Sequence, residues 1–148
     1  PAPEAPSNVL ASISASVDHS QCVGFNTAAL ATDGNLYNRV VASGCTAQDL
    51  VYDLGSQETV SELKYVYCTN PGFSNGAVNA FSLSVGNTID GTYTNVLSDT
   101  IPEDVLGDKI GQELSFPFTA TSGRYWKFSA LSNHGNPDYI WTCEIELY

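Results

Sequence analysis

Hydrophobic and polar residues alternate along most of the chain with a period of two, the pattern that places every second side chain on one face of a β-strand. In the segment 80–85, for example, the pattern puts Phe81, Leu83 and Val85 on the same face. The alternation predicts strands over Val9–Val17, Val51–Leu54, Val60–Tyr67, Ala80–Val85, Thr92–Val96, Gln112–Phe118, Arg124–Leu131 and Tyr139–Tyr148. Helical periodicity is weak throughout, and a short turn at Thr27–Ala31 is the best helical candidate.

Turn-forming pairs separate the predicted strands, among them Asp33-Gly34, Asn75-Gly76 and Asp90-Gly91. Short strands with a turn every 8–12 residues or so are typical of an all-β, antiparallel sandwich or barrel. The chain length accommodates about eight such strands, which favours a jelly roll.

A chain of 148 residues suits one domain with a core of its own. Three of the seven prolines fall in Pro1–Ser7, which predicts an extended N-terminal linker or arm over residues 1–8. The domain itself is expected over residues 9–148.

The charge balance is strongly acidic, with 16 Asp and Glu against 5 Lys and Arg and a net charge of −11. Such a surface repels phosphate backbones and anionic lipids, so nucleic-acid binding is excluded and membrane binding is disfavoured. Anionic polysaccharides are disfavoured for the same reason, unless a metal ion offsets the charge.

Four cysteines stand at positions 22, 45, 68 and 143 without the CxxC spacing of a zinc site. Two disulfides are expected, and of the three possible pairings the strand layout favours Cys22–Cys45 with Cys68–Cys143. Disulfides indicate an oxidising compartment, and therefore a secreted or extracellular protein. A start at Pro1 in a chain without Met fits a processed protein or a domain cut from a longer chain.

Several segments, in order, resemble the discoidin or coagulation-factor C-type domains. Those segments are Ala31-Thr32-Asp33-Gly34-Asn35, Tyr52-Asp53-Leu54-Gly55, Ser84–Val96, Arg124-Tyr125-Trp126-Lys127-Phe128, Asn133–Asn136 and Glu144-Ile145-Glu146-Leu147-Tyr148. The resemblance implies a galactose-binding-like jelly roll and is closest to family 32 carbohydrate-binding modules. Related branches include the fucose-binding F-type lectins and domains that bind phospholipid or protein. The resemblance therefore supports the fold more strongly than it supports any one ligand.

The resemblance also implies a structural Ca²⁺ ion shared by the Asp-Gly loop and the last strand. The implied ligands are Asp33, Asn35, Asn38, Glu144 and the backbone carbonyls of Leu30 and Cys143. Calcium takes six to eight oxygen ligands, which tight loops with one or two carboxylates supply. From spacing alone, Asp33-Gly34 is equally a common turn and Glu144 a solvated strand residue.

Sugar binding needs an aromatic ring against the apolar face of the pyranose and a few polar groups for its hydroxyls. The loop candidates for a galactose-like, N-acetylgalactosamine-like or other neutral glycan are His134, Asn136, Tyr139, Phe73, Asn70, Asn75, His19, Arg39 and Tyr37. Trp141 is more readily a core residue, His134 also suits turn chemistry, and Arg39 could be a surface charge. Where sugar-binding relatives often carry an Arg, this chain reads Tyr67-Cys68-Thr69-Asn70.

Catalysis is not expected, because the chain has no G-x-S-x-G elbow, H-E-x-x-H motif or nucleotide fingerprint. The leading hypothesis is therefore a non-catalytic glycan-binding module, either appended to a secreted enzyme or acting as a lectin. A protein-interaction or adhesion domain and a membrane-binding C-type domain are the alternatives.

Overall fold

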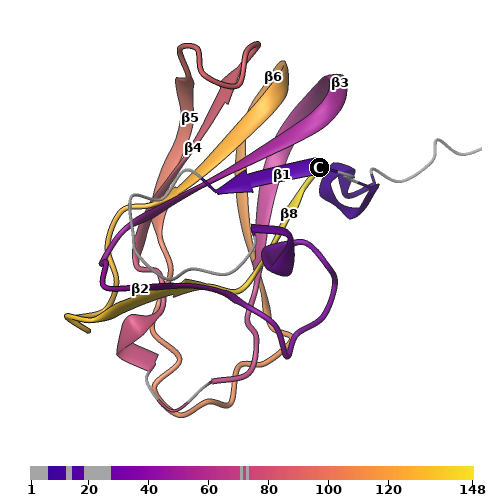
Figure 1. Ribbon diagram of the computed structural model, residues 1–148. Helices are drawn as coiled ribbons and strands as arrows, with labels where there is room; N and C mark the ends of the chain where they lie inside the picture. The colour runs from indigo at the N-terminus through magenta and orange to yellow at the C-terminus, as the bar shows by residue number, and fades with distance from the viewer. Residues whose placement is uncertain (1–6, 13–14, 19–27, 71, 73) are drawn as a thin grey trace, which may run out of the picture.

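The computed structural model describes residues 7–12, 15–18, 28–70, 72 and 74–148 and shows an antiparallel β-sandwich of jelly-roll type (Figure 1). Its eight strands within these residues are β1 (Ala15–Asp18), β2 (Val40–Ser43), β3 (Gln48–Val66), β4 (Ala80–Gly86), β5 (Thr94–Thr100), β6 (Glu113–Ala130), β7 (Tyr139–Thr142) and β8 (Glu144–Leu147). The predicted fold class is confirmed.

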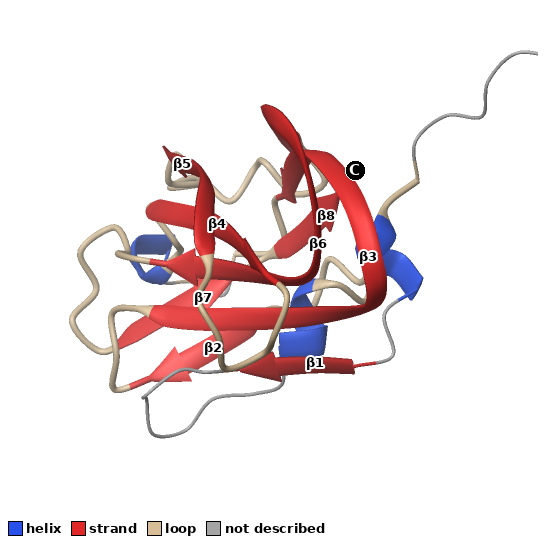
Figure 2. Cartoon of the chain, turned by 90° about the horizontal axis from the view of Figure 1, so that it is seen from above, coloured by secondary structure: helices blue, strands red, loops and turns tan. Residues whose placement is uncertain are grey.

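The helical segments in the described chain are three single 3-10 turns, as the blue segments of Figure 2 show. They are η1 (Val9–Ser12), η2 (Ala28–Ala31) and η3 (Ser74–Gly76). The turn expected at 27–31 is confirmed by η2. No helix among the described residues is long and apolar enough to cross a bilayer.

The two longest strands, β3 and β6, bend so that each contributes to both layers of the sandwich. The first half of β3 pairs with β1 on one side and with the end of β6 on the other, and the end of β6 pairs in turn with β4. The second half of β3 pairs with β8 and with the start of β6. The register breaks between Asp53 and Glu58, where Gly55 adopts a φ of +79° that other residues rarely tolerate. The strand order β1-β3-β6-β4-β5 is completed by β8 on β3 and by a separate β2–β7 pair.

Several predicted boundaries are wrong. The strand expected over 9–17 is instead η1 followed by β1, and the separate strands expected on either side of Gly55 are one strand, β3. Likewise 112–118 and 124–131 belong to one strand, β6, and the C-terminal segment is split into β7 and β8. The chain continues through these bends because β3 and β6 pair with each other on both sides of them.

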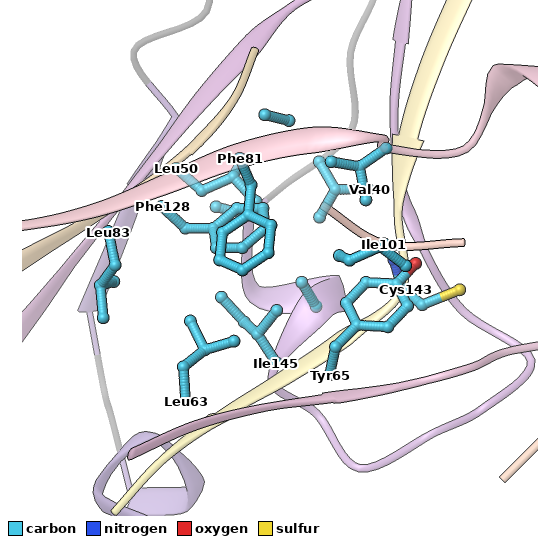
Figure 3. Close-up of a cluster of buried hydrophobic side chains, with 14 of the residues drawn as sticks. Val40, Leu50, Leu63, Tyr65, Phe81, Leu83, Ile101, Phe128, Cys143 and Ile145 are labelled. Carbon is cyan, nitrogen blue, oxygen red and sulfur yellow. The ribbon is translucent and has the colours of Figure 1, made fainter. Parts of the chain in front are cut away.

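The core lies between the layers and is rich in aromatic rings. Phe81 and Phe128 stack at 5.3 Å between ring centroids, and Figure 3 shows them facing Leu63 and Ile145 from the opposite side of the core. All four side chains are almost completely buried. The alternation read from the sequence therefore identifies the inward-facing positions correctly.

A disulfide joins Cys68 to Cys143, with 5.3 Å between their Cα atoms and 75 residues between them in sequence. This half of the predicted pairing is confirmed. Cys45 is also disulfide-bonded. Its predicted partner, Cys22, lies outside the described residues.

Candidate functional site

Loops from distant parts of the chain gather at the end of the sandwich beside η3, at the bottom of Figure 1. We call this region the loop end and define it as the described residues within 32–39, 67–77, 101–112 and 131–138. Backbone hydrogen bonds join its parts, from Thr69 N to the Leu36 carbonyl at 2.9 Å and from His134 N to the Asn75 carbonyl at 2.9 Å. The loop end is therefore one connected surface on a rigid scaffold.

A cavity of about 380 Å³ opens on the loop end. It is lined by Thr69, Asn70, Gly72, Leu106, Gly107 and Ile110. The first three residues follow the end of β3 and give the cavity a polar wall, while Leu106 and Ile110 supply apolar surface from the loop between β5 and β6. Its volume lies in the range of about 300–1,000 Å³ that is usual for small-ligand sites.

The loop that carries the apolar wall is held from within by Asp104. This buried carboxylate accepts hydrogen bonds from the backbone amides of Asp108 at 3.2 Å and Lys109 at 3.3 Å. The side-chain amide of Asn70 donates to the Asp104 carbonyl oxygen at 3.0 Å, which joins the two walls of the cavity. Gly107 has a φ of +66°, and a Cβ built there would lie 3.3 Å from Cβ of Asn70, so this close approach favours glycine.

Arg39 supports the polar wall from beneath. Its Nη2 donates to both the carbonyl oxygen and Oγ1 of Thr69, at 2.8 Å each, and its guanidinium lies 5.7 Å from the ring centroid of Trp141. The segment 67–70 has no Arg of its own, but the structure places the guanidinium of Arg39 against Thr69 in this segment. Burial lowers the pKa of Arg39, and its Nε is buried without a hydrogen-bond partner in the described part of the chain.

The predicted residues Asn75, Asn136 and His134 lie together at one side of the loop end. Asn136 Nδ2 donates to Oδ1 of Asn75 at 3.1 Å. A ring nitrogen of His134, Nε2, lies 2.8 Å from the Ile101 carbonyl oxygen, and Oδ1 of Asn136 accepts from the amides of Asp138 and Tyr139. These contacts favour the turn chemistry considered for His134 and give Asn136 the same kind of role.

The remaining candidate rings are separated by burial. Trp141 is buried, so the expectation that it belongs to the core is confirmed, whereas Tyr37 and Tyr139 are exposed on the loop end and at the start of β7. Phe73 and His19 lie outside the described residues. Their proposed contacts with a ligand stay predictions.

The calcium candidates meet where the Asp33 loop reaches β8. Gly34 N donates to Oε1 of Glu144 at 2.8 Å, and Asp33 accepts from Asn35 N at 2.9 Å and from Asn38 Nδ2 at 2.7 Å. Glu144 is only 4% exposed, and its Oε2 is buried without a partner among the described residues. Burial, together with the nearby Asp33 and Glu146 carboxylates, raises the pKa of Glu144 to about 7.

An orphaned, buried carboxylate oxygen beside a second carboxylate fits an oxygen-preferring cation. No group of three or more His, Cys, Asp or Glu side chains that could hold a metal ion occurs in the described chain. A cation bound here would take two carboxylates, from Asp33 and Glu144. Its other ligands would be amide and backbone oxygens, such as those of Asn35, Asn38, Leu30 and Cys143.

Sequence reasoning missed the contribution of the loop 101–112 to the cavity. The signal was present, because Val105, Leu106 and Ile110 stand among Asp, Gly and Lys residues, where large apolar side chains are seldom needed for a core. In the structure Val105 is 66% exposed and Leu106 is 83% exposed.

The fold and the loop-end cavity define a β-sandwich module of jelly-roll class with its concave surface built from loops. The chain belongs to the F5/8 type C domain family, whose model matches residues 12–145. No curated protein matches the chain.

Solved structures similar to this chain include carbohydrate-binding modules. The CBM32 of AlyQ in complex with 4,5-unsaturated mannuronic acid is 27% identical, with a TM-score of 0.68 over 92% of this chain and 95% of that one. Chitosan-binding module 1, derived from the chitosanase/glucanase of Paenibacillus sp. IK-5, is 22% identical, with a TM-score of 0.71 over 97% and 99%. CpGH89CBM32-5 from Clostridium perfringens, in complex with GalNAc-β-1,3-galactose, is 17% identical, with a TM-score of 0.73 over 96% and 99%.

Proposed function

We propose that this chain is a non-catalytic carbohydrate-binding module that holds a neutral glycan at the loop end. The observation that carries the proposal is the loop-end cavity, with Thr69 and Asn70 on one side and Leu106 and Ile110 on the other. A pyranose has hydroxyls at its edge and C–H groups on its faces, so a site for it combines hydrogen-bonding groups with apolar surface. The family and the similar carbohydrate-binding modules support the same function.

The electrostatics of the whole chain disfavour an anionic glycan. The net charge is −11, and four of the five cations have partners: Arg39 on Thr69, Lys64 on Glu113, Arg124 on Asp53 and Lys127 on the Tyr93 ring. An anionic sugar of the kind bound to the AlyQ module would meet an unfavourable potential here.

We propose a structural Ca²⁺ at Asp33 and Glu144, supported by the buried, unpartnered Oε2 of Glu144. The ion would pin the Asp33 loop to β8 and neutralise two adjacent carboxylates. Its role is stabilising, because the cavity at Thr69 and Asn70 is lined by neither carboxylate.

We also propose that the module acts outside the cell, since it contains a disulfide, and that it is appended to a secreted enzyme. One of the similar modules derives from a chitosanase/glucanase, which supports that arrangement.

A second candidate function is favoured by the exposed apolar side chains of the loop 101–112. Val105, Leu106 and Ile110 together form the kind of apolar surface that binds a protein partner. A membrane-binding role is less favoured, because this loop has Asp104 and Asp108 beside its single cation, Lys109.

Calorimetric titration with a panel of soluble glycans tests the proposal. The panel contains GalNAc-β-1,3-galactose and other neutral disaccharides, an oligomannuronate as the anionic arm and chitotriose as the cationic arm. Leu106→Ala, which changes the cavity wall, is expected to weaken binding of the neutral ligand about tenfold, a loss of about 1.4 kcal/mol. Val105→Ala is the matched control, because Val105 is exposed on the same loop and does not line the cavity. Binding of only a charged glycan, or of no glycan in the panel, would overturn the proposal, and the second outcome would favour the protein-interaction function.

A further inference from the structure

A second cavity, of about 390 Å³, lies at the opposite end of the sandwich. We call it the threonine cavity; it is lined by Val85, Gly86, Asn87, Thr88, Thr92, Thr94, Thr121 and Ser122. These residues belong to the end of β4, the β4–β5 connection, the start of β5 and the bend of β6, which lie at the top of Figure 1, away from η3 and the loop end. Because β4 has seven residues at roughly 3.3 Å each, the two cavities are separated by about 20 Å or more.

Six side chains that line the threonine cavity can form hydrogen bonds, and four of them have free polar atoms. The other two already have partners: Thr121 Oγ1 donates to the Thr119 carbonyl oxygen at 2.8 Å, and Ser122 Oγ lies 2.6 Å from Thr59 Oγ1. Asn87, Thr88, Thr92 and Thr94 make no side-chain hydrogen bond or other polar contact within the described part of the chain. Each hydroxyl is one donor and one acceptor whose hydrogen rotates to suit its partner, and the Asn amide adds two donors and an acceptor. The cavity therefore presents several donors and acceptors at once.

One side of this cavity is rigid. The Tyr93 hydroxyl donates to the Ile89 carbonyl oxygen at 2.8 Å, and Nζ of Lys127 lies 4.2 Å from the centroid of the Tyr93 ring. A Cβ added to Gly86 would lie 3.0 Å from the Thr92 carbonyl oxygen and 3.2 Å from the Tyr93 ring. Because Gly86 has no side chain, the end of β4 packs directly against Thr92 and Tyr93. A ligand would therefore meet a preformed surface.

The chemistry of the lining selects the ligand class. None of the eight lining residues is charged, and the nearby cation Lys127 is placed over the Tyr93 ring. Fixed charges are what hold phosphates, carboxylates and ammonium groups in protein sites, so charged ligands are poorly matched. A neutral polyol, whose hydroxyls exchange donor and acceptor roles with threonine hydroxyls, is well matched.

We propose that the threonine cavity is a second binding site for a neutral sugar, separate from the loop end. The inference rests on the residues of this cavity and stands whether or not the loop end binds a glycan. With both sites occupied, one copy of the chain would contact two sugar units at opposite ends of the sandwich and bridge two glycan chains. Weak binding at each site would then combine into stronger attachment to a polysaccharide.

Titration of ¹⁵N-labelled protein with neutral sugars, followed by amide chemical shifts, tests the inference. The probes are glucose, galactose, mannose and N-acetylglucosamine as monosaccharides and GalNAc-β-1,3-galactose as a disaccharide. We expect saturable shifts at the amides of 86–88, 92–94 and 121–122. The double variant T92V/T94V keeps the branched side chains but removes two hydroxyls, and should weaken this binding about tenfold. Thr100→Val is the matched control, because Thr100 is exposed on β5 outside the cavity, and it should leave the affinity unchanged.

The pattern of shifts separates this inference from the loop-end proposal. Saturable shifts at 86–94 that persist in an Asn70→Ala, Leu106→Ala double variant support the second site on its own. Shifts confined to 69–72 and 104–110 overturn the second site and leave the loop-end proposal standing. If no probe gives a saturable shift at either end, both the second site and the loop-end proposal are overturned. If T92V/T94V and Thr100→Val weaken sugar binding equally, the role of the cavity hydroxyls is overturned.

Discussion

The backbone amide of Gly34 donates a 2.8 Å hydrogen bond to the carboxylate of Glu144, a residue 110 positions later in the chain. This bond fixes the Asp33 loop against β8, close to the disulfide at Cys143. The second carboxylate oxygen of Glu144 is buried without a partner in the described structure, so one oxygen holds the loop and the other is free to bind a cation.

Calcium is expected to stabilise the protein through this carboxylate. A ligand present at about 1,000 times its Kd adds roughly 4 kcal/mol to the free energy of unfolding, which raises the Tm by about 10 °C. Thermal unfolding in millimolar calcium and in EDTA measures the effect. Glu144→Gln should abolish the calcium-dependent rise in Tm, whereas Glu146→Gln, a half-buried neighbour on β8, should keep it. An identical Tm in calcium and EDTA for the unaltered protein would contradict the proposed ion.

Without calcium, the free energy of unfolding should fall as the pH rises from about 5 to about 7.5. The pKa of Glu144 is raised in the folded state to about 7, so the folded protein binds its proton more tightly than the unfolded chain does. The resulting stabilisation is complete below the unfolded pKa and is lost as the pH rises through about 7, a total of roughly 3 kcal/mol. Urea unfolding in EDTA at several pH values measures it, and Glu144→Gln, which does not titrate, should flatten this part of the profile. A profile of the same slope in both proteins would refute the assignment.

The disulfide between Cys68 and Cys143 is expected to stabilise the fold as well as the cavity next to it. Replacing both residues by Ala should lower the free energy of unfolding by about 2–5 kcal/mol, because the unfolded chain regains the freedom of a long loop. Chemical denaturation compares the variant with the unaltered protein. Because Thr69 and Asn70 directly follow Cys68, glycan affinity should fall too. A variant with unchanged stability would show that the strand pairing of β3 and β8 suffices.

Arg39→Lys should weaken glycan binding although Arg39 does not line the cavity. The guanidinium donates to two oxygens of Thr69, and an ammonium group cannot reproduce that fork or the contact with the Trp141 ring. We expect a loss of about tenfold in affinity, or about 1.4 kcal/mol, measured by calorimetry. Arg124→Lys is the control, since Arg124 forms its ion pair with Asp53, away from the loop end. Equal affinity in Arg39→Lys and the unaltered protein would remove Arg39 from the support of the site.

The sequence was sufficient to predict the fold class and the inward-facing positions, because alternation with period two directly reports a strand with one buried face. It failed where strands bend: Gly55 in β3 and the segment 119–123 in β6 separate two predicted strands each, yet pairing between β3 and β6 resumes beyond both. The short strand β2 was missed because four residues carry too little pattern.

The candidate site was predicted less completely, for a physical reason. Motif-like loops such as the one containing His134 and Asn136 attract attention by composition, but their polar groups largely bond to their own backbone. Exposed apolar residues such as Leu106 look the same in a sequence as buried ones. Only the tertiary structure shows which loops face one another across a cavity.

A crystal structure with the tightest-binding neutral glycan of the panel tests the central claim most directly. The account predicts a sugar at the loop end with hydroxyls hydrogen-bonded to Thr69 or Asn70 and its C–H face against Leu106 or Ile110. A sugar bound away from these residues, with the loop-end cavity holding only solvent, would contradict it.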